Sequence, residues 1–441
     1  MSRPPSFALL ASLVMLTSVT SGAEVPDPTE LPSKLTLDEA LRIFRQRGLD
    51  LLIADAAVAG ARADVKSASV IPNPSLGLGA GHTFLYNPSP ADCPGCSATS
   101  WSASISDSAA IEDTLAGKRG LRIAVAEAAL KAARMNRVDA LRNLEFQVKQ
   151  QYIQAVLARD TLDFALEVQK SSTQTFELNR LRYEKGAISE ADEARVETAM
   201  LEADQGVSVA TQALRNAKVG IAFLLGVRGP VPEFHVEQDL PKYVVPASLD
   251  HATPGSLLAE ALDHRPDLKG QAFQSERAEK SIASARRLRI PDVALSVALA
   301  GEGTGTNALQ PPTLSFGVQL PLPLFYQQQG EIAHARADLQ TQRLQFAKVE
   351  AQVVSDVNTA WSNLSATREL VERMEGRLLD RARRARDLVA IQYQKGGASL
   401  LEFLDAQRTY VAINLEYLQD LTNYWTAVFQ LEQAVGVELR K

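Results

Sequence analysis

The stretch RYEKGAIS at residues 182–189 has a close copy, QYQKGGAS, at residues 392–399. Residues 181–227 align without gaps on residues 391–437, and the alignment places Tyr on Tyr, Lys on Lys, Gly on Gly and Ser on Ser in the two copies. A Gly-Val pair also matches near the far end of each window. Such a fixed period predicts a repeated structural unit, so we expect two copies of one plan.

Each copy interrupts a long helical stretch with a glycine. Glycine adopts the left-handed conformation that ends a helix, and a serine three residues later suits the start of the next helix. We therefore expect each copy to be the turn of a helical hairpin, with turns at residues 185–189 and 395–399. The residues at these turns are Tyr183, Lys185, Gly186 and Ser189 in the first copy and Tyr393, Lys395, Gly396 and Ser399 in the second.

Long proline-free stretches predict unusually long helices. At 1.5 Å per residue, a helix over residues 118–184 is roughly 100 Å long, which favours coiled-coil packing over a globular core. A second long helix is expected over 328–394. Shorter helices are expected at residues 49–70, 190–225 and 267–289.

Between the helical stretches, the sequence changes to the two-residue period of β-strands. In TSWSASISDSAAI, residues 99–111, apolar side chains from Trp101 to Ile111 share one face and serines share the other. The same alternation predicts four strands, at residues 73–85, 99–111, 292–301 and 313–322. The expected fold is therefore mainly α, with a small β portion and an internal two-fold repeat.

The alternation fits two kinds of sheet. A half-buried sheet in a water-soluble protein shows the same pattern. Strand lengths near ten residues, polar connecting loops and a small or polar second face favour a membrane barrel. Four strands cannot close a barrel, and open edges are not tolerated in lipid. Two chains would give eight strands with a filled interior, whereas three would give twelve and a channel.

The composition and the N-terminus limit the possible functions. A net charge of −6 argues against nucleic acid as a partner, because such a binder shows a basic patch or stripe. Residues 1–23 have the pattern of a secretory signal peptide, with cleavage expected after Ala23. We expect a first repeat at 24–228, a proline-containing linker at 229–253 and a second repeat at 254–441.

The two cysteines, Cys93 and Cys96, lie in a CPGC stretch inside a predicted loop between strands. In an exported protein a disulfide is the first expectation, and a surface loop that contacts metal is the alternative. The histidines are scattered, and no nucleophile-base set or phosphate loop is visible. The sequence therefore predicts neither an enzyme nor a bound cofactor.

These features resemble the TolC family of outer-membrane efflux ducts over nearly the whole mature chain. The resemblance is carried by the duplicated order of helices and strands, and by YQKGGASLLEFLDAQRTY at residues 393–410. LPLPLFYQQQGEIAHARA at 320–337 and LAGKRGLR at 115–122 look like the heavy-metal branch, the CzcC-like outer-membrane subunits of cobalt–zinc–cadmium resistance pumps.

The resemblance implies a homotrimer with a twelve-stranded barrel in the lipid of the outer membrane and a helical tunnel through the periplasm. It implies two further partners, a periplasmic adaptor protein and an inner-membrane pump of the resistance-nodulation-division type, and heavy-metal cations as the preferred substrate. Drug or small-molecule efflux and type I protein secretion use the same fold and are the alternative functions. A periplasmic coiled-coil scaffold without a channel is the remote alternative.

The resemblance also gives the hairpin turns a role. It implies that they are tips where the adaptor docks; a plain turn is the alternative. Just after the second turn, Glu402 and Asp405 match acidic positions of the family's periplasmic gate, and the first repeat offers Asp192 and Arg195 at the same offsets. The alternative is a solvated charged helix face. An arginine that the family can use at the gate is replaced by Ala398.

Overall fold

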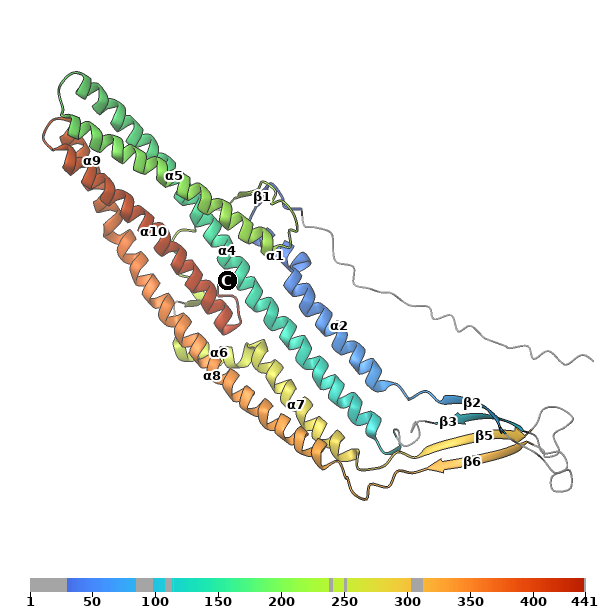
Figure 1. Ribbon diagram of the computed structural model, residues 1–441. Helices are drawn as coiled ribbons and strands as arrows, with labels where there is room; N and C mark the ends of the chain where they lie inside the picture. Colours follow the sequence, from blue (N-terminus) through green and yellow to red (C-terminus); the bar gives the residue numbers. More distant parts are fainter. Residues whose placement is uncertain are drawn as a thin grey trace, which may run out of the picture.

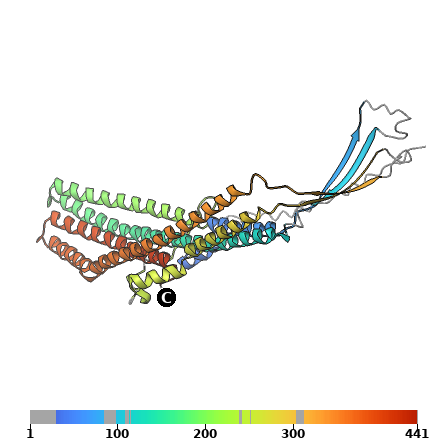
Figure 2. The ribbon, with the colours of Figure 1, turned by 90° about the horizontal axis from the view of Figure 1, so that it is seen from below.

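The computed structural model describes residues 30–84, 98–107, 113, 115–237, 241–249, 252–302 and 312–439. The molecule is elongated, with a sheet at one end of a helical bundle and two hairpin turns at the other (Figure 1). Seen from below, the strands extend well beyond the helices (Figure 2). This arrangement confirms the expected mainly helical fold with a small β portion.

Each repeat contains one very long helical arm and one returning helix. In the first repeat, α4 (Lys118–Glu184) runs unbroken for 67 residues and α5 (Glu190–Leu224) returns from the turn. The second repeat has α8 (Gln329–Arg373), a π-helical turn (Met374–Leu378), α9 (Leu379–Gln394) and the returning α10 (Leu400–Val435). Shorter helices extend the bundle toward the sheet: α1 (Leu37–Arg47), α2 (Leu49–Ser69), α6 (Pro254–His264) and α7 (Pro266–Arg287).

The sheet is antiparallel and combines both repeats. Its strands are β2 (Ser75–His82), β3 (Thr99–Ser106), β5 (Ala294–Glu302) and β6 (Thr313–Gln319). They lie in the order β2-β3-β5-β6, so the two strand pairs of the repeats meet between β3 and β5. Consequently β2 and β6 form the two edges of the sheet.

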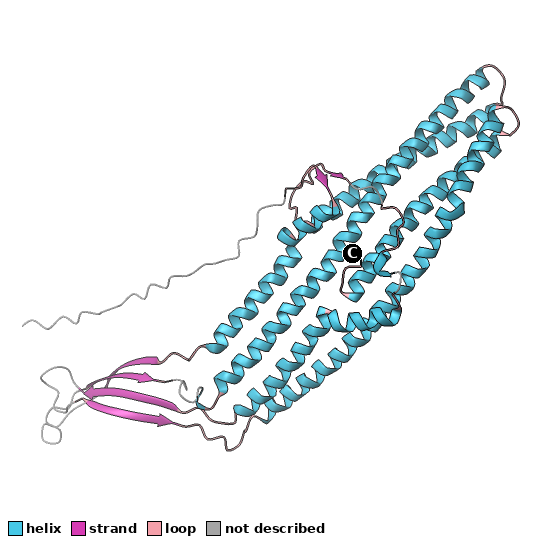
Figure 3. Ribbon diagram, turned by 180° about the vertical axis from the view of Figure 1, so that it is seen from behind, coloured by secondary structure: helices cyan, strands magenta, loops and turns pink. Residues whose placement is uncertain are grey.

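The main core combines residues of both repeats with residues of two short strands. These strands lie beside the middle of the bundle (Figure 3). The Tyr152 hydroxyl of α4 is buried and donates a hydrogen bond of 2.9 Å to the carbonyl of Leu35. Leu35 belongs to β1 (Lys34–Leu35), which pairs in parallel with β4 (His235–Val236) of the segment between the repeats. The N-terminal segment and the inter-repeat segment therefore complete one shared core.

Aromatic side chains of α10 tie the same inter-repeat segment to the second repeat. The Tyr424 hydroxyl donates to the Val244 carbonyl at 3.0 Å, and Trp425 Nε1 donates to the Pro241 carbonyl at 2.8 Å.

In the described part of the chain, no helix is both long and apolar enough to cross a membrane.

Several predicted boundaries need correction. The strands at 73–85 and 313–322 are shorter than expected, and the strand at 292–301 is shifted to 294–302. Pro72, Pro74, Pro291 and Pro321 flank these strands and lack the backbone N–H that a ladder needs. The strand expected at 99–111 ends at Ser106, and residues 108–112 lie outside the described residues.

A single helix was expected over 328–394, and this prediction was wrong in one respect: a π-helical turn separates α8 from α9. Gly376, a weak helix former, lies in the middle of that turn. The carboxylate of Glu375, in the same turn, accepts a hydrogen bond of 2.6 Å from the Tyr417 hydroxyl of α10. The matching part of α4 is an ordinary α-helix, so the two repeats differ here.

Candidate functional sites: the two-faced sheet and the hairpin tips

The pairing register gives the sheet one strongly apolar face. Leu78 lies opposite Ala103, Ala103 opposite Leu299, and Leu299 opposite Leu314, so a row of apolar side chains crosses all four strands. Phe316, one position along this face of β6, is 76% exposed. A contiguous exposed apolar face of this kind marks a surface that contacts lipid or another protein.

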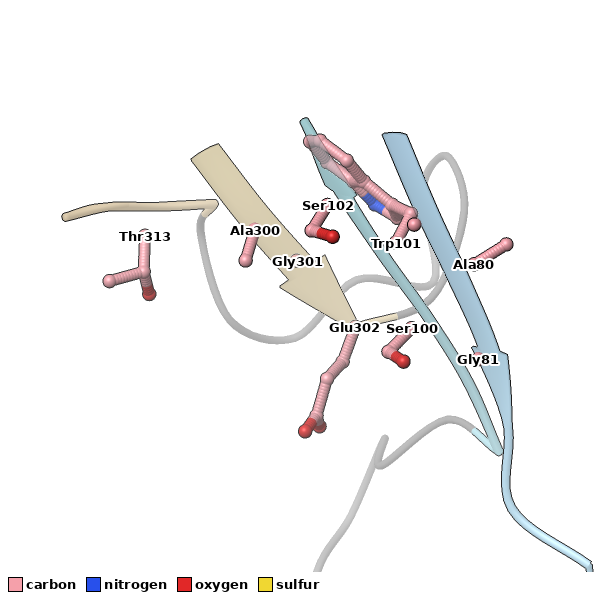
Figure 4. Close-up of a pocket in the computed structure, with 10 residues that line it drawn as sticks. Ala80, Gly81, Ser100, Trp101, Ser102, Ala300, Gly301, Glu302 and Thr313 are labelled. Atoms are coloured by element: carbon pink, nitrogen blue, oxygen red, sulfur yellow. The ribbon is translucent and has the colours of Figure 1, made fainter. Parts of the chain in front are cut away.

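The opposite face carries small and polar side chains. Ser102 lies opposite Gly79 and Ala300, and Ala300 lies opposite Thr313. A hollow of about 490 Å³ lies at the end of the sheet away from the helices, lined by Ser100, Ser102, Ala300 and Glu302 of this face and also by Trp101 of the apolar face (Figure 4). Glu302 is the only acidic, lysine or arginine side chain in the four described strands. This face is suited to water.

Pairs of glycine and serine on neighbouring strands keep the polar face free of bulky side chains. A Cβ placed on Gly79 would lie 2.6 Å from the Ser102 hydroxyl oxygen, so that hydroxyl occupies the space above the glycine. Three further pairs share this arrangement: Gly77 with Ser104, Gly81 with Ser100, and Gly317 with Ser296. The wall therefore presents hydroxyl groups but few protruding side chains.

At the opposite end of the molecule, both hairpin turns are Schellman motifs. Gly186 has a φ of 70°, and the next residue, Ala187, donates a 2.8 Å hydrogen bond to the Arg182 carbonyl. Gly396 has a φ of 76°, and Gly397 donates the matching bond of the second turn, also at 2.8 Å. The left-handed glycine therefore ends each long helix as the sequence indicated.

Serine begins each returning helix. Ser189 Oγ accepts a 3.2 Å hydrogen bond from the backbone N–H of Asp192, and Ser399 Oγ accepts one of the same length from Glu402. Only the second cap is reciprocal, because Glu402 Oε2 accepts a 2.7 Å bond from the Ser399 backbone N–H. This bond, with one from the Ser399 hydroxyl, lowers the pKa of Glu402.

The two tyrosines at the turns have different environments. Tyr393 is half-buried; its hydroxyl donates a 2.5 Å hydrogen bond to Asn179 Oδ1 of α4, and its ring stacks on Phe403 with centroids 5.0 Å apart. The Arg182 guanidinium lies 5.2 Å from the centre of the same ring. Tyr183, its sequence counterpart, is exposed. Tyr393 therefore joins the two hairpins instead of presenting its ring outward.

The four predicted gate residues form two separate sets. Asp192 accepts a bond of 3.1 Å from Arg195 and one of 2.8 Å from the Ser189 hydroxyl. Glu402 belongs to the cap just described, and Asp405 is exposed further along α10. Within the described residues, no ion pair joins the α5 set to the α10 set. Lys185 and Lys395 are exposed at the turns.

Sequence reasoning missed the contacts that hold the tips together. Asn179 is fully buried, and a small apolar cluster of Val196, Leu400 and Leu404 lies beside it. Their signal in the sequence was weak, because the apolar spacing of α4 is loose and nothing marked Asn179 as buried. Cys93 and Cys96, like residues 1–23, lie outside the described residues.

Comparisons with known proteins agree with this geometry. The family model described as outer membrane efflux protein matches residues 40–227 and 257–437. The cobalt-zinc-cadmium resistance protein CzcC of Cupriavidus metallidurans is 23% identical, over 93% of this chain and 92% of CzcC. The pyoverdine export outer membrane protein OpmQ of Pseudomonas aeruginosa is 24% identical, over 85% of this chain and 80% of OpmQ.

Solved structures share the fold along nearly the whole chain. The CusC structure superimposes with a TM-score of 0.74 at 17% identity, covering 91% of this chain and 92% of CusC. The Campylobacter jejuni CmeC outer membrane channel gives a TM-score of 0.77 at 14% identity, covering 92% and 87%. With a family model that matches both repeats, the chain belongs to the outer membrane efflux proteins and is an efflux channel of the outer membrane rather than an enzyme.

Proposed function

We propose that three copies of this chain join their sheets into one twelve-stranded barrel, continued by a helical tunnel through the periplasm. The observation that carries this proposal is the sheet itself: β2 and β6 have only one partner strand each among the described residues, while the apolar face is exposed. In lipid, such edges must be paired. Twelve strands close the edges and leave a bore lined by the glycine–serine face.

Native mass spectrometry and channel recordings test this assembly together. We expect the mass of a trimer in detergent and discrete conducting events in planar bilayers, because a hydroxyl-lined bore conducts water and ions. A purified protein that stays monomeric would contradict the proposal. So would a trimer with no conducting state, even after Glu402→Ala and Asp405→Ala together.

The hairpin turns are the proposed docking tips for a periplasmic adaptor, which would connect this duct to an inner-membrane pump of the resistance-nodulation-division type. Tyr183, Lys185 and Lys395 support the proposal because they are exposed at the hairpin turns. The two turns lie at the end of the bundle opposite the sheet (Figure 1). A photo-crosslinking residue at Tyr183 or Lys395 should capture the adaptor in cells. The same residue at Leu344, which is exposed on α8 away from the tips, should not.

The acidic residues of α10 are the proposed periplasmic gate. In a trimer, Glu402 and Asp405 would supply six carboxylates, which repel one another and attract cations. Asp192 differs because Arg195 already balances its charge. Asp405→Ala should therefore reduce cation selectivity in recordings more than Asp192→Ala does, and equal effects would count against a gate built on α10.

Heavy-metal cations are the proposed substrate, and export of small organic molecules is the second candidate. The first rests on the similarity to a protein named for cobalt, zinc and cadmium resistance, and the second on the similarity to one named for pyoverdine export. Growth of a deletion strain on zinc, cobalt, cadmium, copper and several drugs separates them. Sensitivity to metals alone, reversed by the intact gene, supports the first; sensitivity to drugs alone supports the second. A defect only in an exported protein would instead indicate a type I secretion duct.

A further inference from the structure

An apolar ridge projects from the segment that connects β6 to α8. Phe325 is 97% exposed, Leu324 71% and Leu322 66%, and Tyr326 beside them is also exposed. This segment leaves the bundle as a loop at the level where the strands meet the helices (Figure 1). Clustered apolar side chains of this size are costly to expose to water, so another surface is expected to cover them.

The ridge continues the apolar face of β6 in sequence. Phe316 and Val318 belong to that face, and apolar residues go on alternating through Leu320, Leu322 and Leu324. Strand pairing, however, stops at Gln319. The alternating apolar residues therefore continue for several positions past the end of β6.

Two prolines make this unpaired extension compatible with the edge of a membrane. Pro321 and Pro323 have no backbone N–H to leave unsatisfied away from water. The N–H of Leu324 donates a 2.9 Å hydrogen bond to the carbonyl of Leu322. The segment thus offers apolar side chains while exposing fewer backbone donors than an ordinary loop.

Polar contacts hold the base of the ridge in one conformation. The Tyr326 hydroxyl donates a 2.5 Å hydrogen bond to Glu331 Oε2 and accepts one of 3.2 Å from the Gly330 N–H. A Cβ on Gly330 would lie 2.6 Å from that hydroxyl, so glycine allows the approach. Gln328 is the one residue other than glycine with positive φ in the described chain, at 61°. This strained turn redirects the chain into α8.

The length of the strand explains why an extension is useful. Seven residues of β6 at about 3.3 Å each, tilted by about 40°, span roughly 18 Å along the membrane normal. The apolar band of an outer-membrane barrel is about 25 Å tall. If the ridge lies at the membrane boundary, it lengthens the apolar surface of β6 at the helical, periplasmic end.

We propose that the ridge of Leu322, Leu324 and Phe325, with Tyr326 at its base, inserts into the interface of the periplasmic leaflet. Its occupant is lipid, because the ridge is continuous with the face that the proposed barrel turns toward lipid; the inference rests on that barrel. Tyr326 suits this position, since an amphipathic ring with its hydroxyl held by polar groups is typical of the membrane–water boundary.

Depth-dependent fluorescence quenching tests the proposal. A fluorophore is attached at Phe325→Cys in a Cys93→Ser, Cys96→Ser background, and the trimer is placed in phosphatidylethanolamine–phosphatidylglycerol vesicles. Nitroxide groups are carried near the top or the bottom of the acyl chains. We expect the shallow nitroxide to quench the Phe325→Cys label at least twofold more than the deep one, with little quenching by aqueous iodide.

Two control positions separate the ridge from the barrel. A label at Phe316→Cys should be quenched by the deep nitroxide, and one at Leu344→Cys on α8 by iodide alone. If Phe316→Cys behaves as expected but Phe325→Cys is quenched by iodide, the ridge lies in water and the inference is overturned. Quenching of Phe325→Cys by neither agent means that a second copy covers it, which also overturns the inference. Iodide quenching at Phe316→Cys would overturn the barrel itself.

Unlabelled variants give a second readout. Phe325→Asp should lower the fraction of protein recovered in the outer membrane at least threefold, because a carboxylate replaces the most exposed apolar side chain of the ridge. Phe325→Trp should leave that fraction unchanged, since tryptophan is favoured at the same interface. Equal recovery of both variants would contradict the proposal.

Discussion

The two hairpins of this chain have the same turn but different surroundings. Gly186 and Gly396 end their helices in the same left-handed conformation. Just before each turn lies a tyrosine: Tyr183 is exposed, while Tyr393 is packed between the two hairpins. The first arm is one continuous helix, whereas the second contains a π-helical turn. Duplication therefore preserved the backbone motif, and the side chains around it took separate roles.

The largest difference between the hairpins should come from removing the tyrosine of the second one. Tyr393→Ala removes the ring stack on Phe403, the hydrogen bond to Asn179 and the contact with Arg182. From typical values for an aromatic pair and a hydrogen bond, we expect a loss of about 2–3 kcal/mol at the tip. Hydrogen exchange measures this as amides near the tip that exchange roughly 30-fold faster or more.

Tyr183→Ala is the matched control, because that side chain is exposed. Its effect should stay within about 0.5 kcal/mol, the usual range for a surface substitution. Equal losses in the two variants would remove the asymmetry on which the comparison rests.

A substitution at the shared glycine should act on both hairpins alike. Nothing lies within 4 Å of a Cβ placed on Gly186 or Gly396, so Gly186→Ala and Gly396→Ala differ from the parent mainly by left-handed strain. We expect each to cost about 1–2 kcal/mol, measured by exchange of the amides around each turn. A much larger loss at one turn would show that its glycine has a contact role as well.

The helix caps should differ by a smaller amount. Ser399→Ala removes an oxygen from a reciprocal cap, and Ser189→Ala removes one from a simple cap. Each loss should be about 1 kcal/mol, with the greater loss at Ser399 because Glu402 also loses a partner. The readout is protection of the first-turn amides of α10 and α5, and Ser→Thr variants should retain most of it in both helices.

The smallest expected effect is a pH dependence of the second cap. Because the folded-state pKa of Glu402 is lowered by its bonds from Ser399, its contribution is present above the unfolded pKa of about 4.3 and is lost as pH falls through the folded pKa. First-turn protection of α10 relative to α5 should thus decrease on acidification below about pH 4. In Glu402→Gln this ratio should not change with pH, and an unchanged acid loss would assign the effect to another group.

The sequence predicted those parts of the molecule that depend on local chemistry. Glycine and serine at fixed spacing indicated both turns, and strict alternation indicated which face of the sheet is apolar. The proline-free stretch over 118–184 coincides with α4. In each case the backbone requirement and the residue type that meets it lie within a few positions of each other.

The rest of the tip depends on contacts between distant segments. Asn179 and Tyr393 meet only because the two hairpins pack together, and no local pattern marks either as a partner of the other. The carboxylate of Glu402 completes a cap in this structure, and its role in a gate stays a prediction. An acidic residue three positions after a serine fits both roles.

The short parallel pair of β1 and β4 also affects how the chain can fold. Lys34 pairs with His235, and Leu35 with Val236, so two residues near the start of the described chain pair with a segment about two hundred positions later. Contacts of such long sequence separation form slowly, because loop-closure entropy opposes them. The Tyr152 bond to Leu35 ties α4 to this event. The part of the core around Leu35 and Tyr152 therefore forms only once the segment between the repeats is in place, which adds a late step of long sequence separation to folding.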